Sequence, residues 1–436
     1  MNKPLYTVNI ERLSHECRGI GHIGEKTAFV LGALPGETVE CQVIQKHRNY
    51  LDACFSSLIT TASPDRITAK CPHFLVCGGC SVQHIKPEAQ IRFKQALLLE
   101  QLSHSGKAIP QTILDPVTGP AFGYRHKARL GVRYVNKKEK ILVGFRETQG
   151  RYLAEINHCD ILHPSIGYKL HELAELIAQL SIPRDIAQIE VAMGDTEIAL
   201  IFRHLAPLNE NDLALLSTFG ETYHFHIYLQ PNKPGACSKL YPADGHERLH
   251  YALPEYDLNF AFHPTDFTQI NPTINRKMVS LALQLLNPAP HDKVLDLFCG
   301  LGNFTLSLAR KAGHVIGVEG CEKMVARAKE NALLNHIHNV HFYAHDLMAD
   351  KTDAPWIHDH YSQLLIDPPR SGARDIIQKI GPLKIPKIVY ISCNPATLAR
   401  DTEILTQHFG YTLKAAGILD MFPQTAHVES IALFER

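Results

Sequence analysis

The stretch KVLDLFCGLGNF, residues 293–304, determines the fold that we expect for the second half of the chain. Its apolar start is typical of a buried strand, and Gly300 and Gly302 let the backbone turn closely around a ligand before a helix begins. Glu319 ends the next apolar run, where an acidic residue meets ribose hydroxyls in this type of fold. Thr305 replaces the third glycine of a dinucleotide-binding turn. That replacement favours S-adenosylmethionine, a cofactor without pyrophosphate.

Apolar runs and amphipathic segments alternate regularly over residues 266–436. Buried strands joined by amphipathic helices form an open, mainly parallel, doubly wound sheet, which binds ligands at the carboxyl ends of its strands. We therefore expect an α/β Rossmann-like domain over 266–436. The runs that we interpret as strands are KVLDLF, HVIGVEG, VHFYAHD, QLLID, KIVYIS, TLKAAGILD and ESIALFE.

Residues 1–63 carry a different pattern. Short segments that alternate apolar and polar side chains are separated by glycines, which we place in turns. This pattern indicates a small β-barrel of the OB type, a common platform for nucleic acids; a small β-domain used only for contacts within the chain is the alternative. The glycines are Gly19, Gly21, Gly24, Gly32 and Gly36.

Residues 64–265 mix helical and strand patterns, which is typical of an α+β domain. We expect a helix over 87–104, a hairpin over 122–156 that turns near Asn136, and a helix over 168–179 followed by further strands. The sequence thus predicts three domains.

The charge is divided along the chain, although its sum is zero. Residues 1–151 hold 21 Lys and Arg against 12 Asp and Glu, whereas residues 152–436 hold 23 against 32. A polyanionic partner is therefore expected to contact the first third. A hydrophobic content of 45% excludes a disordered protein. The sequence contains no long apolar run, so we expect a protein that does not bind membranes. It also shows no secretion signal and has eleven cysteines, which we expect in a reducing cytoplasm.

Nine basic and only two acidic residues lie between residues 124 and 151, interleaved with aromatic ones. Phosphates pair with such cations and bases stack on aromatic rings, so the segment suits single-stranded RNA; a solvated strand face is the alternative. The basic residues are Arg125, Lys127, Arg129, Arg133, Lys137, Lys138, Lys140, Arg146 and Arg151.

Three chemically active side chains follow or precede strands of the predicted sheet. Asp367 ends QLLID, although it could merely end a strand before two prolines. Cys393 lies between KIVYIS and a predicted helix, whose dipole favours a thiolate nucleophile over an inert buried thiol. Glu429 can reach the same cavity as a general base if the last strand lies beside the one that precedes Cys393; otherwise it is an exposed carboxylate.

Three cysteines in CPHFLVCGGC have the spacing C-x5-C-x2-C, and the two glycines allow a tight turn around one centre. Cys71, Cys77 and Cys80 need a fourth ligand, for which Cys159 is the best candidate. The spacing fits an iron–sulfur cluster or a zinc ion equally well.

The motifs DLFCGLGNF, LLIDPPRSG, ISCNPATLARD, FTQIN and HVES together resemble those of RNA uracil-C5 methyltransferases. The resemblance implies that Cys393 adds to C6 of uracil, that C5 takes the methyl group of S-adenosylmethionine, and that Glu429 removes the C5 proton. Carbon 5 is a poor nucleophile until a thiolate adds at C6, so the chemistry needs both groups. The residues that match the family's cofactor pocket are Gln269, Phe298, Asn303, Glu319, Asp346 and Asp367.

Two other classes of methyltransferase fit the sequence less well. Enzymes that methylate exocyclic nitrogens would carry Asn in place of Asp367. Cytosine-C5 RNA methyltransferases carry a second cysteine where Arg370 stands. Both differences favour uracil as the methylated base.

The resemblance extends over nearly the whole chain. Residues 1–63 are similar to the TRAM domain, an RNA-binding module, and the four cysteines match the 4Fe–4S ligands of the family's iron–sulfur members. Because relatives that modify tRNA generally lack both features, we expect the target to be a uridine of 23S rRNA in a loop or single-stranded region. We also expect the protein to be a monomer. The alternatives are the same chemistry on a tRNA loop, and a catalytically silent RNA-binding protein with a metal cluster. Since several close relatives lack the cluster, we expect it to act in folding or in shaping RNA.

Overall fold

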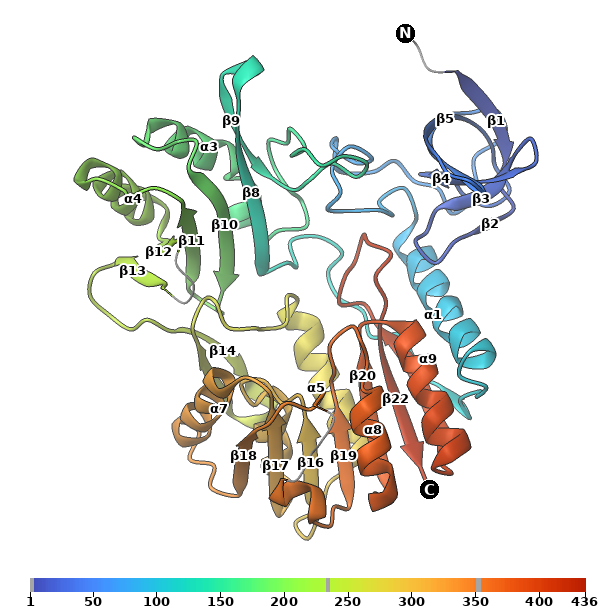
Figure 1. Cartoon of the computed structure of the whole chain (residues 1–436), viewed down its shortest axis with the longest axis vertical. Coiled ribbons are helices and arrows are strands. Elements are labelled where there is room, and N and C mark those ends of the chain that lie inside the picture. Colours follow the sequence, from blue (N-terminus) through green and yellow to red (C-terminus); the bar gives the residue numbers. More distant parts are fainter. Residues whose placement is uncertain (1–3, 233–235, 350–353) are drawn as a thin grey trace.

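Eight strands of the computed structural model form the open sheet expected for the second half of the chain, in the lower part of Figure 1. The structure describes residues 4–232, 236–349 and 354–436. Neighbouring strands from β18 to β20 run parallel, and β22 runs antiparallel to both of its neighbours. The order across the sheet is β18 (Val340–Ala344), β17 (His314–Glu319), β16 (Lys293–Leu297), β19 (Gln363–Ile366), β20 (Lys387–Ser392), β22 (Glu429–Glu435), β21 (Thr412–Leu419) and β7 (Thr112–Ile113).

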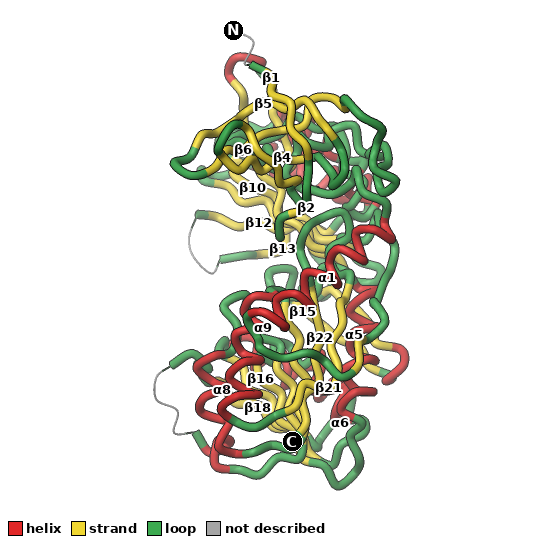
Figure 2. The backbone as a smooth tube through the Cα atoms, turned by 90° about the vertical axis from the view of Figure 1, so that its right-hand side faces the viewer, coloured by secondary structure: helices red, strands yellow, loops and turns green. Residues whose placement is uncertain are grey.

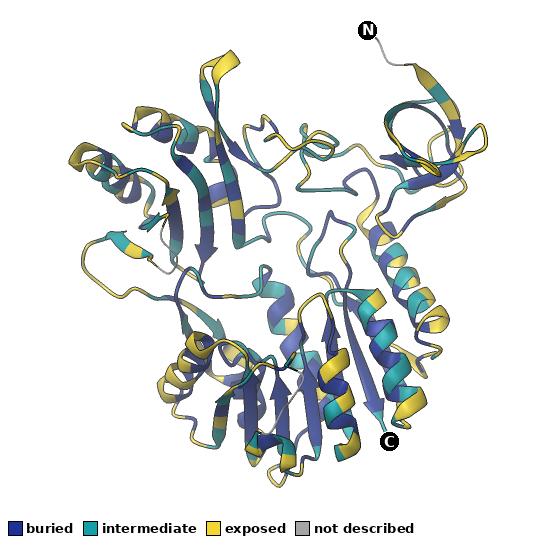
Figure 3. Ribbon diagram, in the orientation of Figure 1, coloured by how far each residue is buried: buried dark blue, intermediate teal, exposed yellow. Residues whose placement is uncertain are grey.

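The two faces of this sheet bury separate hydrophobic cores, because successive strand residues point to opposite faces. Val294 of β16 belongs to one core, and its neighbours Leu295 and Leu297 belong to the other. Figure 3 accordingly shows the central strands as buried. The first core contains α5 (Pro272–Leu286), α6 (Asn303–Ala309) and α7 (Glu322–Leu334), and the second contains α1 (Pro87–His104), α8 (Arg374–Ile380) and α9 (Pro395–Glu403).

Segments that precede residue 266 also pack on this sheet. The helix α1 has the bounds predicted from the sequence, and its Leu98 and Leu102 lie in the second core. The short strand β7 extends the sheet beside β21. The hairpin of β14 (Leu249–Leu253) and β15 (Leu258–Phe262) buries Phe260 and Phe262 in the first core. Three segments from before residue 266 thus pack on the C-terminal sheet, and the domain limits 1–63, 64–265 and 266–436 remain a prediction.

The middle of the chain forms a second sheet, with the order β13-β12-β11-β10-β8-β9. The expected basic hairpin is confirmed: β8 and β9 pair antiparallel and are joined by a 3₁₀ turn over Asn136–Lys138. Apolar side chains of α3 and α4 cover the sheet. The elements are β8 (Lys127–Val135), β9 (Lys140–Gly144), β10 (Ile186–Met193), β11 (Ile198–His204), β12 (His226–Pro231), β13 (Ser238–Tyr241), α2 (Pro164–Gly167), α3 (Leu170–Gln179) and α4 (Glu210–Tyr223).

The N-terminal residues form a six-stranded, strongly curved sheet, at the upper right of Figure 1. Its order is β1-β5-β6-β4-β3-β2, and its core contains Val8, Val30, Val39 and Ala53. In Figure 2 this sheet and the middle sheet lie at one end of the molecule, and the eight-stranded sheet lies at the other. The strands are β1 (Leu5–Asn9), β2 (Arg12–Leu13), β3 (Gly19–Ile23), β4 (Lys26–Leu31), β5 (Thr38–Lys46) and β6 (Tyr50–Leu58).

Two of the glycines expected in turns lie inside a strand instead. Gly19 and Gly21 belong to β3, which the sequence pattern did not reveal. A Cβ on Gly21 would lie 2.2 Å from the carbonyl oxygen of Asn9, so this glycine lets two backbone segments approach closely. Gly24 does adopt a turn conformation with a φ of 60°.

Among the described residues, no helix is both long enough and apolar enough to cross a membrane.

Candidate active site

Cys393 and Glu429 lie opposite each other at the ends of two paired strands. The antiparallel register of β20 and β22 pairs Ser392 with Ser430, so the next residue on each side is Cys393 or Glu429. The Ser430 hydroxyl donates a hydrogen bond of 3.1 Å to the Ser392 carbonyl, which ties the two strand ends together. The expectation that the last strand lies beside the strand preceding Cys393 is therefore confirmed.

The residue after the cysteine fixes the start of α9. The Asn394 side chain accepts a hydrogen bond of 3.1 Å from the Ala396 amide, and its amide nitrogen donates one of 3.2 Å to the Arg370 carbonyl. An asparagine that caps a helix in this way satisfies free backbone groups of its first turn. Cys393 is thus held between a strand and a capped helix, and its side chain remains partly accessible.

The surroundings of Cys393 favour the neutral thiol. Burial raises its pKa to about 11, and nearby Glu429 and Asp367 add to the rise, while Arg370 opposes it. These contributions oppose the thiolate that we expected from the helix N-terminus, because burial and two nearby carboxyl groups disfavour the charged form of the thiol.

Two carboxyl groups beside the cysteine also have raised pKa values. Burial raises the pKa of Asp367, just after β19, to about 7. The pKa of Glu429 lies well above its ordinary range, because the carboxyl is buried and Asp367 is near; Arg370 opposes the rise. A carboxyl group of raised pKa is a stronger base than usual once ionised, which suits both side chains to general acid–base catalysis. Sequence reasoning used Arg370 only to exclude cytosine and did not foresee its electrostatic position.

The glycine turn after β16 leaves open space at the carboxyl edge of the sheet. Gly300 has a φ of 56°, and a Cβ built on it would meet no atom within 4 Å. Phe298 also adopts a left-handed conformation, with a φ of 65°. The Gly300 amide donates a hydrogen bond of 3.1 Å to Glu319, which also accepts one from the Cys321 amide at 3.0 Å. The turn and Glu319, predicted to serve one pocket, are thus joined directly.

The remaining predicted pocket residues differ in how free their side chains are. Asn303 exchanges two hydrogen bonds with Asn275, at 3.0 and 3.1 Å, and its oxygen also accepts one from Tyr251. Asp346 is exposed beyond β18 and accepts a hydrogen bond of 2.9 Å from the Met348 amide. Gln269 is half-buried before α5. The geometry thus assigns Asn303 and Asp346 structural hydrogen bonds in addition to any contact with a ligand.

Asp296 is a polar group of this edge that the predicted pocket did not include. It is fully buried in β16, and one oxygen accepts a hydrogen bond of 2.5 Å from Thr305. Its other oxygen has no partner among the residues that the structure describes. Burial, with Asp367 and Glu319 nearby, raises its pKa to about 8. The acidic start of the glycine motif was the available signal.

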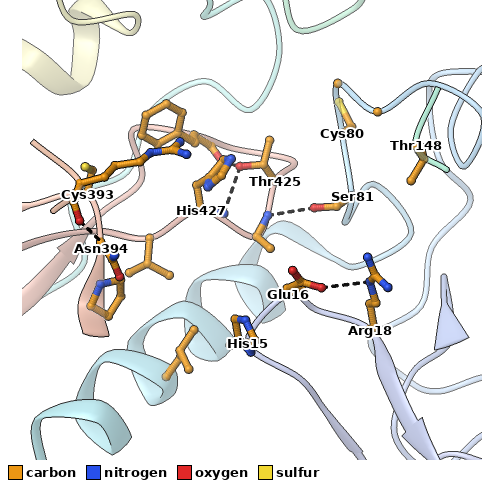
Figure 4. A pocket seen from close by; sticks show the side chains of 18 of the residues that line it. His15, Glu16, Arg18, Cys80, Ser81, Thr148, Cys393, Asn394, Thr425 and His427 are labelled. Carbon is orange, nitrogen blue, oxygen red and sulfur yellow. Dashed lines mark hydrogen bonds and ion pairs between the residues drawn. The ribbon is translucent and has the colours of Figure 1, made fainter. Parts of the chain in front are cut away.

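A cleft of about 740 Å³ opens beside Cys393, and residues from the N-terminal, middle and C-terminal parts of the chain line it. In Figure 4, His15, Glu16 and Arg18 face it from the turn between β2 and β3, and Cys80 and Ser81 from the cysteine segment, residues 71–82. Cys393 and His427 lie on its other side. Arg125, Arg129 and Phe145 of the basic hairpin region and Arg370 also line it. The nucleophile candidate therefore opens into a cleft with basic and aromatic walls.

The four predicted metal ligands line a second, small cavity. Cys71, Cys77, Cys80 and Cys159 are free thiols around it. Each thiol has a raised pKa, with burial as the largest cause and neighbouring cysteines contributing in three of them. Within the described ranges, no three His, Cys, Asp or Glu side chains are arranged to hold one metal ion. Cys80 lines both this cavity and the cleft.

Known proteins match this chain over nearly its full length. The 23S rRNA (uracil(1939)-C(5))-methyltransferase RlmD of Alcanivorax borkumensis is 49% identical over 98% of this chain and 96% of its own. The RlmD of Legionella pneumophila strain Lens is 48% identical over 100% and 98%. The chain belongs to the RlmD family.

Two family matches agree with this membership of the RlmD family. Residues 245–436 match the tRNA (Uracil-5-)-methyltransferase family, and residues 5–55 match the TRAM domain. The TRAM domain expected from the N-terminal pattern is therefore confirmed.

A solved structure supports the fold. The Pyrococcus abyssi tRNA (uracil-54, C5)-methyltransferase, in complex with S-adenosyl-L-homocysteine, has a TM-score of 0.73 at 22% identity, covering 98% of this chain and 100% of its own. At this identity the likeness extends to the architecture, including the C-terminal methyltransferase fold.

Proposed function

We propose that this RlmD-family protein transfers the methyl group of S-adenosylmethionine to C5 of a uridine in 23S rRNA, the one that its relatives' name numbers 1939. The observation that carries the proposal is the position of Cys393 opposite buried Glu429 at the ends of two paired strands, with Cys393 lining a cleft that has basic walls. A thiol and a carboxyl in this arrangement supply the two groups that methylation of a uracil carbon requires.

The reaction divides between the two side chains. The Cys393 thiolate forms a bond to C6 of uracil, and the displaced electron pair makes C5 nucleophilic. C5 takes the methyl group that S-adenosylmethionine supplies, and S-adenosylhomocysteine leaves. Glu429 then accepts the C5 proton, the bond between sulfur and C6 breaks, and the thiolate is regenerated. The raised pKa of Glu429 suits this step, because it makes the carboxylate a stronger base than an ordinary glutamate.

The carboxyl edge of the sheet is suited to the methyl donor. The open space at Gly300 would admit its amino-acid part or ribose, and Glu319, with Gln269, Phe298, Asn303 and Asp346 around the same edge, would contact it. Asp367 would contact either the donor or the uracil edge. The positive sulfonium would lie near Asp296 and Asp367, whose carboxyl groups can carry a compensating charge.

The basic hairpin is proposed to bind the RNA that flanks the target. Arg125, Arg129 and Phe145 line the cleft, and Arg133, Arg146 and Arg151 line a hollow of about 920 Å³ beside it. Exposed Tyr152 borders the same hollow. Phosphates pair with the arginines and unstacked bases stack on the rings. Phe267, 66% exposed before α5, would stack on the flipped uracil or its neighbour.

We infer that Cys71, Cys77, Cys80 and Cys159 hold a 4Fe–4S cluster. Four free thiols around one cavity, three partly buried and Cys159 fully buried, are a suitable donor set for it. A zinc ion with bonds of 2.3 Å would bring its sulfurs to about 3.8 Å from one another, whereas an iron–sulfur cube holds them farther apart. The distances between the four sulfurs therefore distinguish a cluster from a single zinc ion. Its place beside the cleft suits a structural role next to RNA.

Methylation of a tRNA loop by the same two groups is the second candidate function. The fold neighbour from Pyrococcus abyssi acts on tRNA, whereas the relatives of nearly 50% identity act on 23S rRNA. The closer similarity favours rRNA. We further expect the protein to be cytoplasmic. We also expect a monomer, and sedimentation of the purified protein would test its oligomeric state.

Incubation with S-adenosylmethionine and RNA that contains 5-fluorouridine tests the chemistry. Fluorine at C5 cannot leave as a proton, so the covalent methylated adduct persists on a denaturing gel. We expect this adduct with the natural protein and none with Cys393→Ala that still binds the cofactor. If the natural protein forms no adduct, it is a silent RNA-binding protein and the proposal is wrong.

A further inference from the structure

A loop of nine residues, here called the 420–428 loop, leads from β21 to Glu429. Thr425, Ala426, His427 and Val428 line the cleft, so the loop forms part of its wall. The carboxyl group of Glu429 accepts no hydrogen bond from any side chain or amide in the described part of the chain. Its position therefore depends on the backbone at the start of β22, where the pairing with Leu419 meets the end of the 420–428 loop.

A buried lysine of α1 holds the first residues of the loop. Lys94 is only 2% exposed, and its Nζ lies 2.7 Å from Asp420 Oδ1 and donates a second hydrogen bond of 3.0 Å to the Phe422 carbonyl. Asp420 follows Leu419, which is the cross-strand partner of Glu429 in β21. The ammonium group is thus bound to the residue that follows Leu419, the cross-strand partner of Glu429.

A buried glutamine one turn earlier in α1 holds the middle of the loop. Gln90 donates a hydrogen bond of 3.0 Å to the side-chain oxygen of Gln424, and the Gln424 amide donates one of 3.2 Å back to it. Gln424 has a φ of 66°, a left-handed conformation that a residue with a side chain adopts only when its surroundings hold it. The two glutamines supply that restraint.

The cysteine segment holds the last part of the loop. The amides of Ser81 and Val82 donate hydrogen bonds of 2.9 and 3.2 Å to the Gln424 carbonyl. The Ser81 hydroxyl accepts one of 2.9 Å from the Ala426 amide, drawn in Figure 4. The loop is therefore fixed from segments more than 300 residues away in the chain, none of which contributes an atom to the reaction.

We propose that Lys94 and Gln90 are positioning residues that hold Glu429 opposite Cys393 and thereby control removal of the C5 proton. This inference rests on the proposed function. Its selectivity for that step follows from the anchors on the cysteine side: Ser392 and Asn394 fix the backbone around Cys393 and do not involve these α1 side chains. A loosened loop would displace the base and leave the nucleophile in place.

Lys94→Met tests the proposal, because methionine keeps the packing of the helix and removes the ammonium group. We expect kcat on natural uridine RNA to fall about tenfold to a hundredfold, the loss that a displacement of about 1 Å causes, while KM for RNA changes little. Addition and methyl transfer still occur, so a methylated enzyme–RNA adduct should accumulate. Methyl groups labelled through S-adenosylmethionine would then migrate with the protein on a denaturing gel, without fluorine in the RNA.

Two further variants control this experiment. Arg92→Met removes a long, exposed cation from the same helix and should leave kcat and the adduct unchanged. Because Lys94→Met leaves Asp420 buried without its partner, Lys94→Met/Asp420→Asn removes both charges and keeps the loop folded if the single variant is unstable. The double variant should accumulate the same adduct.

Each outcome separates this inference from the proposed function. If the natural protein methylates RNA and a folded Lys94 variant turns over at the same rate, or slows without accumulating adduct, the positioning role is wrong while the function stands. If the natural protein neither methylates RNA nor forms an adduct, the proposed function itself is wrong. Slow turnover with accumulated adduct supports both.

Discussion

Cys393 should react as a high-pKa thiol, and the pH dependence of its reactivity measures this directly. The pKa of about 11 predicts that one thiol in about a thousand is ionised at pH 8, against about one in ten for a thiol of pKa 9. Each thiolate of the higher pKa is about tenfold more nucleophilic, which offsets part of that hundredfold deficit. We therefore expect Cys393 in the folded protein to react about tenfold more slowly at pH 8 than in the unfolded chain.

The assay follows modification of the Cys393 peptide by a small neutral disulfide reagent, with mass spectrometry to distinguish it from the other cysteines. The rate should rise about tenfold per pH unit between pH 7 and pH 10, because each unit adds tenfold more thiolate below the pKa. The same peptide in urea is the control, and its rate should level off near pH 9. If the fold merely restricted access of the reagent to Cys393, the rate in the folded protein would be lower at every pH, but the midpoint of its pH dependence would equal that of the control in urea.

Two perturbations test the causes of the shift. Glu429→Gln removes a group that raises the pKa, so the midpoint should move down, and Arg370→Met removes one that lowers it, so the midpoint should move up. S-adenosylmethionine should lower the midpoint through its sulfonium charge, whereas neutral S-adenosylhomocysteine should not. A native rate that already levels off below pH 8 without ligand would refute this reasoning and return the helix dipole to the main role.

The other predictions concern RNA and the cysteines. Arg133→Gln/Arg151→Gln should make the plot of log K for RNA against log salt less steep by about 1.4, since each phosphate contact contributes about 0.7. Lys384→Gln, which changes a cation just before β20, at the other end of that strand from Cys393, should leave the slope unchanged. A double variant with the slope of the natural protein would exclude the hairpin from the interface. Phe267→Ala should weaken RNA binding by about 1–3 kcal/mol, and unchanged affinity would exclude stacking on this ring. Protein purified without oxygen should be brown and contain iron, and Cys80→Ser should lose both; a colourless protein with one zinc per chain would contradict the cluster.

Local sequence patterns were sufficient to predict most of the fold. The bounds of the helix 87–104 and the presence of the basic hairpin followed from periodicity and turn residues, because those signals lie within a few positions; the paired strands are shorter than the predicted 122–156. The strand β3 was missed, since its glycines serve a close approach to Asn9 that only the folded chain reveals. The pairing of β20 with β22 was the condition on which Glu429 could approach Cys393, and the register of the two strands confirms that pairing.

The candidate site was predictable where residues are adjacent in sequence and not where burial decides. Cys393 could be placed at a helix start from its motif, but its pKa depends on Glu429 and Asp367, which only the sheet brings near. Lys94 did leave a signal, because it occupies the apolar side of its helix, three residues after Ile91 and four before Leu98. Its partner Asp420 is 326 residues away, so the pattern could not identify it.

Mapping of 5-methyluridine by mass spectrometry in RNA from a strain that lacks this gene tests the central claim most directly. We expect one 5-methyluridine to disappear from 23S rRNA and to return with the natural gene but not with Cys393→Ala, while tRNA remains unchanged. Loss of 5-methyluridine from tRNA with intact 23S rRNA would contradict the account.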